Sequence, residues 1–239
     1  MVNELDNFLE NYTGTKASVE ERFMTRGTIE LASPICQGKD VLQMGLGNGM
    51  VAKYLDKIVL KQTIIEGSSK ILEKFSFKSN KTDFKNTFFE KYKSENKFDV
   101  ILANHVLEHV DNPSKVLNYI KLFLKDEGKL FITVPNANSI HRLIGVEMGL
   151  LSNKYQLNSS DIKGGHQRVY DFKSLKDDIK KAGLTIKDSG GYNLKMVSLS
   201  QMKDWPQELL DAIFTISQSM PKEICTNLWV TCKNNGENI

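Results

Sequence analysis

The first 135 residues alternate between short apolar runs and segments whose apolar residues recur at helical spacing. Runs such as residues 98–103, rich in Val, Ile and Leu, are typical of strands buried on both faces. We expect strands at 41–44, 58–65, 82–84, 98–103 and 129–134, and helices at 18–33, 51–55, 68–75 and 113–124. Strands that alternate with helices predict an α/β fold built on a parallel, doubly wound sheet.

The regular alternation stops after residue 136, and the elements expected beyond it are more widely spaced. They are helices at 139–151, 174–182 and 207–219, strands at 184–187 and 227–232, and a polar loop at 152–170. A loop of that length inside a compact domain is often functional. A short helix is expected within residues 1–14. Pro34 is expected to end the helix at 18–33, and Gly128 is expected to end the helix at 113–124.

Three glycines spaced two apart follow the first strand: Gly45, Gly47 and Gly49. Glycine allows positive φ and a close approach of the backbone to a ligand, so this turn is a candidate nucleotide site. Alone, the glycine pattern is weak evidence for nucleotide binding. Glu66 supports it, because this residue ends the second strand about 20 residues further on, where a carboxylate would hold a ribose. A nicotinamide dinucleotide fits less well, because Gly-x-Gly-x-x-Gly would need glycine where the chain has Met50.

The composition argues against nucleic acid and membranes as binding partners. The chain has 239 residues, 40% hydrophobic and 26% charged, with a formal net charge of +3. Lys and Arg are mixed with Asp and Glu, so no nucleic-acid surface stands out. We expect no membrane partner, because no apolar run approaches the roughly 18 residues that span a bilayer. The absence of a signal-peptide pattern and of paired cysteines favours a cytoplasmic protein. We expect a monomer or a homodimer.

Four segments, in order, resemble the motifs of class I S-adenosylmethionine-dependent methyltransferases of the small-molecule type. They are Val-Leu-Gln-Met-Gly-Leu-Gly-Asn-Gly, Ile-Ile-Glu-Gly, Phe-Asp-Val-Ile-Leu-Ala-Asn-His-Val-Leu-Glu-His-Val-Asp-Asn-Pro and Gly-Lys-Leu-Phe-Ile-Thr-Val-Pro-Asn. The resemblance covers roughly residues 35–190. It implies a Rossmann-like, seven-stranded, mostly parallel sheet with an antiparallel last strand. It also implies one methyltransferase domain: an N-terminal helical lid (1–34), a cofactor-binding core (35–135), and acceptor-side inserts with the C-terminal strands (136–239).

The resemblance also implies where the cofactor S-adenosylmethionine, and its product S-adenosylhomocysteine, would bind. The three glycines would approach the methionine and ribose parts, and Glu66 would accept hydrogen bonds from both ribose hydroxyls. The remaining expected contacts are Gly67 and Ser68 at the adenine edge, Phe88 or Phe89 beside the ring, and Asn104 and His105 beside the sulfonium. Gln43 is a departure, because many relatives carry an acidic residue there.

Methyl transfer is a direct displacement, so a base is needed only if the acceptor must lose a proton. Imidazole titrates near neutrality, which makes His166 and His105 the candidate bases. Arg168, Tyr170 and Tyr12 are the candidate acceptor contacts. No metal site is expected: Asp99, His105, Glu108, His109 and Asp111 have suitable side chains, but they read as a strand followed by a helix entry that Glu108 and His109 would cap or brace.

The acceptor is the least determined part of the hypothesis. A polar acceptor fits the tyrosine, histidine and lysine content of residues 136–170 and 190–226. The segment Met-Pro-Lys-Glu-Ile-Cys-Thr-Asn-Leu-Trp-Val is similar to methyltransferases of bacterial surface-glycan biosynthesis. The first expectation is therefore a sugar or nucleotide-sugar hydroxyl. Amine or carboxylate methylation in secondary metabolism, or a non-catalytic cofactor-binding partner, are the alternatives.

Overall fold

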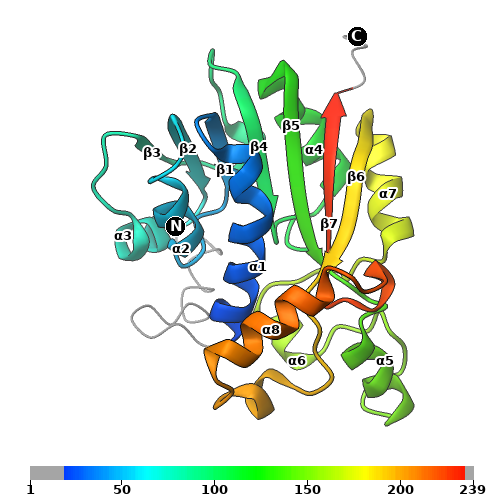
Figure 1. The fold of residues 1–239 in the computed structure, drawn as a ribbon. Coiled ribbons are helices and arrows are strands. Elements are labelled where there is room, and N and C mark those ends of the chain that lie inside the picture. Colours follow the sequence, from blue (N-terminus) through cyan, green and yellow to red (C-terminus); the bar gives the residue numbers. More distant parts are fainter. Residues whose placement is uncertain (1–18, 235–239) are drawn as a thin grey trace.

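A seven-stranded sheet in the order β3-β2-β1-β4-β5-β7-β6 forms the centre of the structure, a computed structural model that describes residues 19–234 (Figure 1). The strands are β1 (Asp40–Met44), β2 (Lys61–Glu66), β3 (Thr82–Asn86), β4 (Phe98–Asn104), β5 (Leu124–Pro135), β6 (Leu184–Tyr192) and β7 (Asn227–Asn234). β7 runs antiparallel to both β5 and β6, and the other neighbouring pairs are parallel. The predicted mostly parallel sheet is thus confirmed.

Helices cover both faces of this sheet. The helices are α1 (Val19–Cys36), α2 (Met50–Leu55), α3 (Ser69–Phe75), α4 (Pro113–Ile120), α5 (Ile140–Glu147), α6 (Ser159–Lys163), α7 (Phe172–Lys181) and α8 (Gln207–Ser217), and the 3₁₀ turns are η2 (Phe89–Lys91), η3 (Lys121–Phe123), η4 (Leu199–Met202) and η5 (Lys222–Ile224). Val41 of β1 packs in a cluster with α1 and α2, whereas Leu42 packs with α4 and α7. Adjacent strand residues therefore face opposite layers, which is why the strands read as continuous apolar runs.

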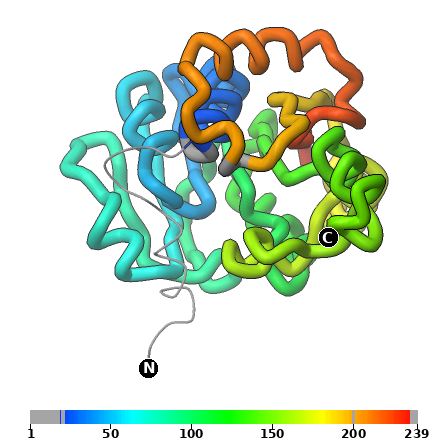
Figure 2. The backbone as a smooth tube through the Cα atoms, turned by 90° about the horizontal axis from the view of Figure 1, so that it is seen from below, coloured from blue at the N-terminus to red at the C-terminus, as the bar shows by residue number. Residues whose placement is uncertain are grey.

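The carboxyl ends of β1, β4, β5 and β6 lie at one edge of the sheet, because these four strands run the same way. Strand order reverses between β1 and β4, where open α/β sheets bind their ligands. Figure 1 shows α5, α6 and α8 beyond this edge, and Figure 2 looks onto it. Within residues 19–234 no helix combines the length and apolarity needed to cross a membrane.

Pro34 and Gly128 do not end the helices that they were expected to end. Pro34 lies inside the last turn of α1, which continues to Cys36. Proline has no backbone N–H to donate, but the end of the helix keeps a backbone hydrogen bond, because Gln37 N donates to Ser33 O at 3.1 Å. Gly128 does not close a helix: it lies within β5, and a Cβ on it would lie 3.0 Å from Phe98 O. Its lack of a side chain permits the close strand approach at the register shift near Phe98.

Gly49, the residue before α2, has both positive φ and a close neighbour. Its φ is 74°, and a Cβ there would lie 2.9 Å from Phe75 O. We expect Gly49→Ala to lower the free energy of unfolding by about 3 kcal/mol in urea denaturation, because strain and a backbone clash add. Gly38→Ala is the control: φ is 68° with nothing within 4 Å, so about 1 kcal/mol is expected. Equal losses would contradict the predicted clash.

Candidate functional site

The turn after β1 is left-handed at each of its three predicted glycines. The φ angles are 78° at Gly45, 55° at Gly47 and 74° at Gly49. Residues other than glycine rarely adopt this backbone conformation, so the three glycines allow the turn to form. Gly45 N donates to Ile65 O at 2.8 Å, which holds the turn against the end of β2. The turn therefore leaves the sheet at the strand switch point, where open α/β sheets bind their ligands.

Glu66 joins this turn to the start of α3. Its buried carboxylate accepts from Leu46 N at 3.0 Å through one oxygen and from Ser68 N at 2.8 Å through the other. Ser68 in turn caps α3, since its hydroxyl accepts from Ile71 N at 3.2 Å. Each carboxylate oxygen has two lone pairs and can accept more than one hydrogen bond. This arrangement fits the predicted contact with a ribose diol.

Gln43 braces the same turn from within β1. Its side chain is buried, and Nε2 donates to Gly45 O at 2.8 Å. The amide orientation is unambiguous because a carbonyl oxygen can only accept. Oε1 is buried and has no hydrogen-bond partner within residues 19–234, so it can accept from a ligand donor such as an amino group. An acidic residue at this position would instead place a carboxylate against the Gly45 carbonyl.

The other predicted cofactor residues lie at the same edge. Asn104 ends β4, and neither its amide oxygen nor its nitrogen has a hydrogen-bond partner in the described part of the chain, although both are buried. Phe88 follows β3 and is 42% exposed, with Lys91 Nζ 5.3 Å from its ring centroid. Gly67 lies between Glu66 and Ser68. Their contacts with the cofactor remain predictions.

His105 is fixed at three points after β4. Its φ is 52°, and its backbone N donates to Thr133 O at 3.0 Å. Nδ1 lies 3.1 Å from Glu108 Oε1, and Nε2 lies 2.9 Å from Tyr192 Oη. Since an ionised carboxylate only accepts, Nδ1 is the donor to Glu108. With both nitrogens engaged, His105 must exchange a partner before it can take a proton from an acceptor.

Glu108 is fully buried beneath this ring. Burial raises its pKa, but the hydrogen bond from His105 and the charges of His105, His109 and His166 outweigh burial, so the pKa of Glu108 lies below its usual value. Helix α4 is capped by Asn112, whose side chain accepts from Lys115 N at 3.0 Å. Of the expectation that Glu108 and His109 cap or brace this helix, capping is therefore wrong, because Asn112 directly precedes the first turn, and bracing stays a prediction.

Tyr192 lies in the segment 190–226 whose side chains were expected to suit a polar acceptor, but its contact with His105 was not predicted. The side chain ends β6, is fully buried, and lies 3.5 Å from Thr28 Oγ1 of α1 as well as 2.9 Å from His105. Burial raises the pKa of Tyr192 to about 12, so the phenol stays protonated. A Cβ on Gly27 would lie 2.3 Å from the Tyr192 ring, which shows that α1 accommodates the ring only through this glycine.

His166 is held in the segment between α6 and α7. Its backbone N donates to Asp161 O at 2.9 Å, and its Nδ1 lies 3.5 Å from Asp161 Oδ1. Asp161 also pairs with Arg142 at 3.1 Å, and the Arg142 guanidinium is buried. A carboxylate beside Nδ1 orients an imidazole and stabilises its protonated form, as in acid–base dyads. Asp161 and Arg142 were not predicted, because neither belongs to a local motif.

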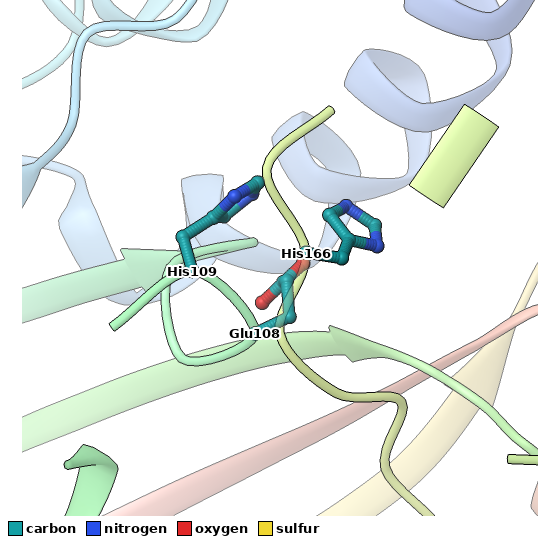
Figure 3. Close-up of side chains that lie close together, drawn as sticks. All are labelled: Glu108, His109 and His166. Atoms are coloured by element: carbon teal, nitrogen blue, oxygen red, sulfur yellow. The ribbon is translucent and has the colours of Figure 1, made fainter. Parts of the chain in front are cut away.

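Glu108, His109 and His166 form one cluster from two segments of the chain (Figure 3). The His109 and His166 rings meet edge to face at 4.8 Å between centroids, and the possible ligand atoms of the three residues lie within 4.8 Å of one another. These are donor types that bind zinc. Ligands about 2.1 Å from a tetrahedral zinc ion lie about 3.4 Å apart, so atoms 4.8 Å apart would have to close on an ion. The absence of a metal remains a prediction.

Two of the three residues predicted to contact the acceptor, Arg168 and Tyr170, lie within the described part of the chain. Arg168 donates to the carbonyl oxygens of Leu107 and Val110, which ties the segment before α7 to the loop after β4. Tyr170 is buried and donates to Asp178 at 2.9 Å. Both side chains thus have internal partners, and their contact with an acceptor remains a prediction. Tyr12, like the expected helix at 1–14, lies outside the described residues.

Asp161 gives the site a predicted acid sensitivity. Burial raises its pKa, but hydrogen bonds from His166, Asn158 and Arg142 lower it to about 2, below the ordinary 3.8. A carboxyl whose folded pKa is depressed stabilises the fold above pH about 4 and loses this contribution as pH falls toward 2. The stability difference between wild type and Asp161→Asn is therefore expected to shrink by about 1 kcal/mol from pH 7 to pH 3 in urea denaturation. Asp177→Asn, on the exposed face of α7, is the control, and a pH-independent difference for Asp161→Asn would contradict the prediction.

Comparison with known proteins shows the family to which this chain belongs. A family model described as a methyltransferase domain matches residues 17–188. The ubiquinone biosynthesis O-methyltransferase of Pelagibacter ubique is 28% identical over 166 residues, which cover 67% of each chain. The enzyme of the same name from Actinobacillus pleuropneumoniae is 31% identical over 109 residues, 41% of this chain and 47% of that protein. The chain thus spans about half the length of this curated relative.

The structural comparison agrees with the predicted architecture. The N-methyltransferase NodS from Bradyrhizobium japonicum, solved in complex with S-adenosylhomocysteine, is similar at a TM-score of 0.59. The likeness covers 91% of this chain and 89% of that one, at 12% sequence identity. At this identity the likeness shows the fold alone, and it confirms the predicted Rossmann-like sheet.

Proposed function

Because this chain belongs to the class I S-adenosylmethionine-dependent methyltransferases, we propose that it transfers a methyl group to a hydroxyl of a small polar molecule. The observation that carries the choice of a hydroxyl is His166 beside Asp161, next to the buried Glu108. A hydroxyl must lose its proton on methylation, so it benefits from an oriented base. The O-methyltransferase names of the relatives support the same choice.

The cofactor side of the proposal rests on the turn after β1. When bound, S-adenosylmethionine supplies an electrophilic methyl group on a sulfonium. Glu66 would accept hydrogen bonds from the ribose hydroxyls, and the bonds from Leu46 N and Ser68 N hold its carboxylate in place. Gln43 Oε1 would accept from the amino group, and the glycines leave space for the backbone to contact the cofactor. These residues bind and orient the cofactor, and no proton needs to move among them.

The acceptor side requires alignment and proton removal. His166 would accept the hydroxyl proton, and Asp161, ionised at neutral pH, would stabilise the resulting imidazolium. His105 is the alternative base, but both of its ring nitrogens already have partners. We therefore assign His105 to positioning the loop after β4. A sugar or nucleotide-sugar hydroxyl stays the first proposed acceptor, with amine or carboxylate acceptors as alternatives.

Transfer of a labelled methyl group tests the proposal directly. The purified chain is incubated with methyl-labelled S-adenosylmethionine and matched acceptors: sugars and nucleotide-sugars, the corresponding amino sugars, and sugar acids. Label on a hydroxyl oxygen is the expected result. Label on nitrogen or carboxylate would replace the O-methyltransferase proposal. Cofactor binding with no transfer to any acceptor would favour a non-catalytic cofactor-binding protein.

A further inference from the structure

Two consecutive residues before α7, Gln167 and Arg168, hold the loop between β4 and α4. The carbonyl oxygens of residues 107–111, five in a row, all accept hydrogen bonds from this pair. Gln167 supplies two of these bonds: its backbone N donates to Glu108 O at 2.8 Å, and its Nε2 donates to His109 O at 2.8 Å. Since backbone acceptors inside a protein need donors, the conformation of this loop depends on a segment far along the chain.

Arg168 supplies the other three bonds. Its guanidinium donates to Leu107 O at 2.8 Å, to Asp111 O at 3.2 Å and to Val110 O. The guanidinium also donates to Gln167 Oε1 at 3.3 Å, which leaves Gln167 Nε2 facing the loop. These bonds are charge-assisted and use a rigid planar fork of donors, which the single ammonium of a lysine does not offer. The Gln167–Arg168 pair therefore fixes the segment before α7 to the loop with a defined geometry.

The bonds of this pair bring one candidate base next to the loop. His166 directly precedes Gln167, and Glu108 is the residue to which the Gln167 backbone is bonded. The His109 and His166 rings accordingly meet at 4.8 Å between centroids, with the Glu108 carboxylate beside them (Figure 3). The Gln167–Arg168 pair thus sets the position of His166 relative to the loop after β4.

The position of this loop matters for methyl transfer, because the loop follows the residues that would flank the sulfonium. Asn104 ends β4, and His105 comes directly after it. In a direct displacement the acceptor oxygen has to lie in line with the methyl group while His166 stays within reach of the hydroxyl proton. A misplacement of about 1 Å costs about 100-fold in rate. Holding His166 against this loop therefore fixes the base relative to the methyl group.

We propose that Gln167 and Arg168 are positioning residues for methyl transfer, which hold the segment that carries His166 at a fixed distance from the loop after β4. The inference rests on the proposed function, in which His166 is the base. Neither residue touches the reacting atoms, so replacing them lowers kcat and leaves KM nearly unchanged. A direct contact of Arg168 with the acceptor would have the opposite effect, a higher KM at an unchanged kcat.

Nuclear magnetic resonance tests the positioning without any acceptor. The chain contains four histidines, so their ring protons can be assigned by replacing each histidine in turn. Rings at 4.8 Å predict a nuclear Overhauser cross-peak between His109 and His166 in the full chain. In the double variant Gln167→Met/Arg168→Met we expect this cross-peak to weaken severalfold, because the side-chain donors to the loop are lost. An unchanged cross-peak in the variant, or its absence in wild type, would overturn the inference.

Two further measurements keep folding apart from positioning. Arg168→Lys retains the charge but loses the planar fork, so a smaller loss of the cross-peak is expected even where the double variant fails to fold. The affinity for S-adenosylhomocysteine should stay unchanged in the folded variants, since neither residue lies at the glycine turn.

Kinetics separate positioning from acceptor contact. Turnover is measured with every sugar or nucleotide-sugar that receives a methyl group on oxygen in the labelling assay. Arg168→Lys is expected to lower kcat by up to about 100-fold at a nearly unchanged KM. Lys97→Met is the matched control: Lys97 also donates to a backbone carbonyl, Leu122 O, but it precedes β4 at the amino edge of the sheet. This variant should change neither kcat nor KM.

A raised KM with an unchanged kcat in Arg168→Lys would overturn the inference and make Arg168 an acceptor contact. Unchanged kinetics in both Arg168→Lys and Gln167→Met would overturn it as well. If the wild-type chain methylates no acceptor, the proposed function fails instead. The cross-peak between His109 and His166 would then still show whether the Gln167–Arg168 pair positions His166.

Discussion

Replacing Glu66 with alanine is expected to weaken S-adenosylhomocysteine binding about 100-fold or more, measured by calorimetric titration. The proposed carboxylate bonds to two ribose hydroxyls are charge-assisted, and a loss of about 3 kcal/mol corresponds to this factor. The variant also leaves Leu46 N and Ser68 N without their carboxylate acceptor. The glycine turn and the start of α3 would therefore lose their common anchor, and we expect a lower melting temperature as well.

Two further variants separate binding from folding. Glu66→Gln keeps the size and an acceptor oxygen but not the charge, so an intermediate loss of about tenfold is expected. Glu73→Ala, on the exposed face of α3, should change neither affinity nor melting temperature. A folded Glu66→Ala protein that binds S-adenosylhomocysteine as tightly as wild type would show that the carboxylate serves only the apo structure.

Replacing His166 with alanine is expected to lower kcat about 100-fold or more with a hydroxyl acceptor, because general-base catalysis contributes factors of this size. Cofactor affinity should not change, since His166 lies in the segment before α7 and not at the glycine turn. The pH dependence of kcat between about pH 6 and about pH 9 should also flatten, because imidazole titrates in this range. Turnover is measured with the acceptor identified by methyl labelling.

Three outcomes would change the assignment of His166. Unchanged turnover across this pH range would remove it from catalysis. A larger loss in His105→Gln than in His166→Ala would move the base to His105. A rate that a chelator abolishes and a divalent ion restores would assign Glu108, His109 and His166 to a metal instead.

Local sequence was sufficient for the cofactor half of the fold. The apolar strands and the glycine turn were predicted because their conformations depend on residues within a few positions: φ is positive at Gly45, Gly47 and Gly49 as expected. The boundaries at Pro34 and Gly128 were wrong because packing against distant strands outweighed local helix signals. Gly128 faces Phe98 O, 30 residues earlier in the chain, which no local pattern contains.

The acceptor half was less predictable, since its contacts join distant segments. His105 was singled out from its motif, but its partner Tyr192 lies 87 residues further along the chain. The pairing of Arg142 with Asp161 likewise joins α5 to α6, which are separated in the chain by a loop. Arg142 and Asp161 became site candidates only through this contact.

By itself the sequence determined the α/β order, the turn at Gly45–Gly49, the carboxylate at Glu66 and the family resemblance, because each depends on spacing along the chain. Only the tertiary structure decided that both nitrogens of His105 are engaged, that Asp161 supports His166, and that Arg142 pairs with Asp161. The physical reason is that hydrogen bonding and electrostatic potential act through space, and loops of any sequence separation can bring their groups together.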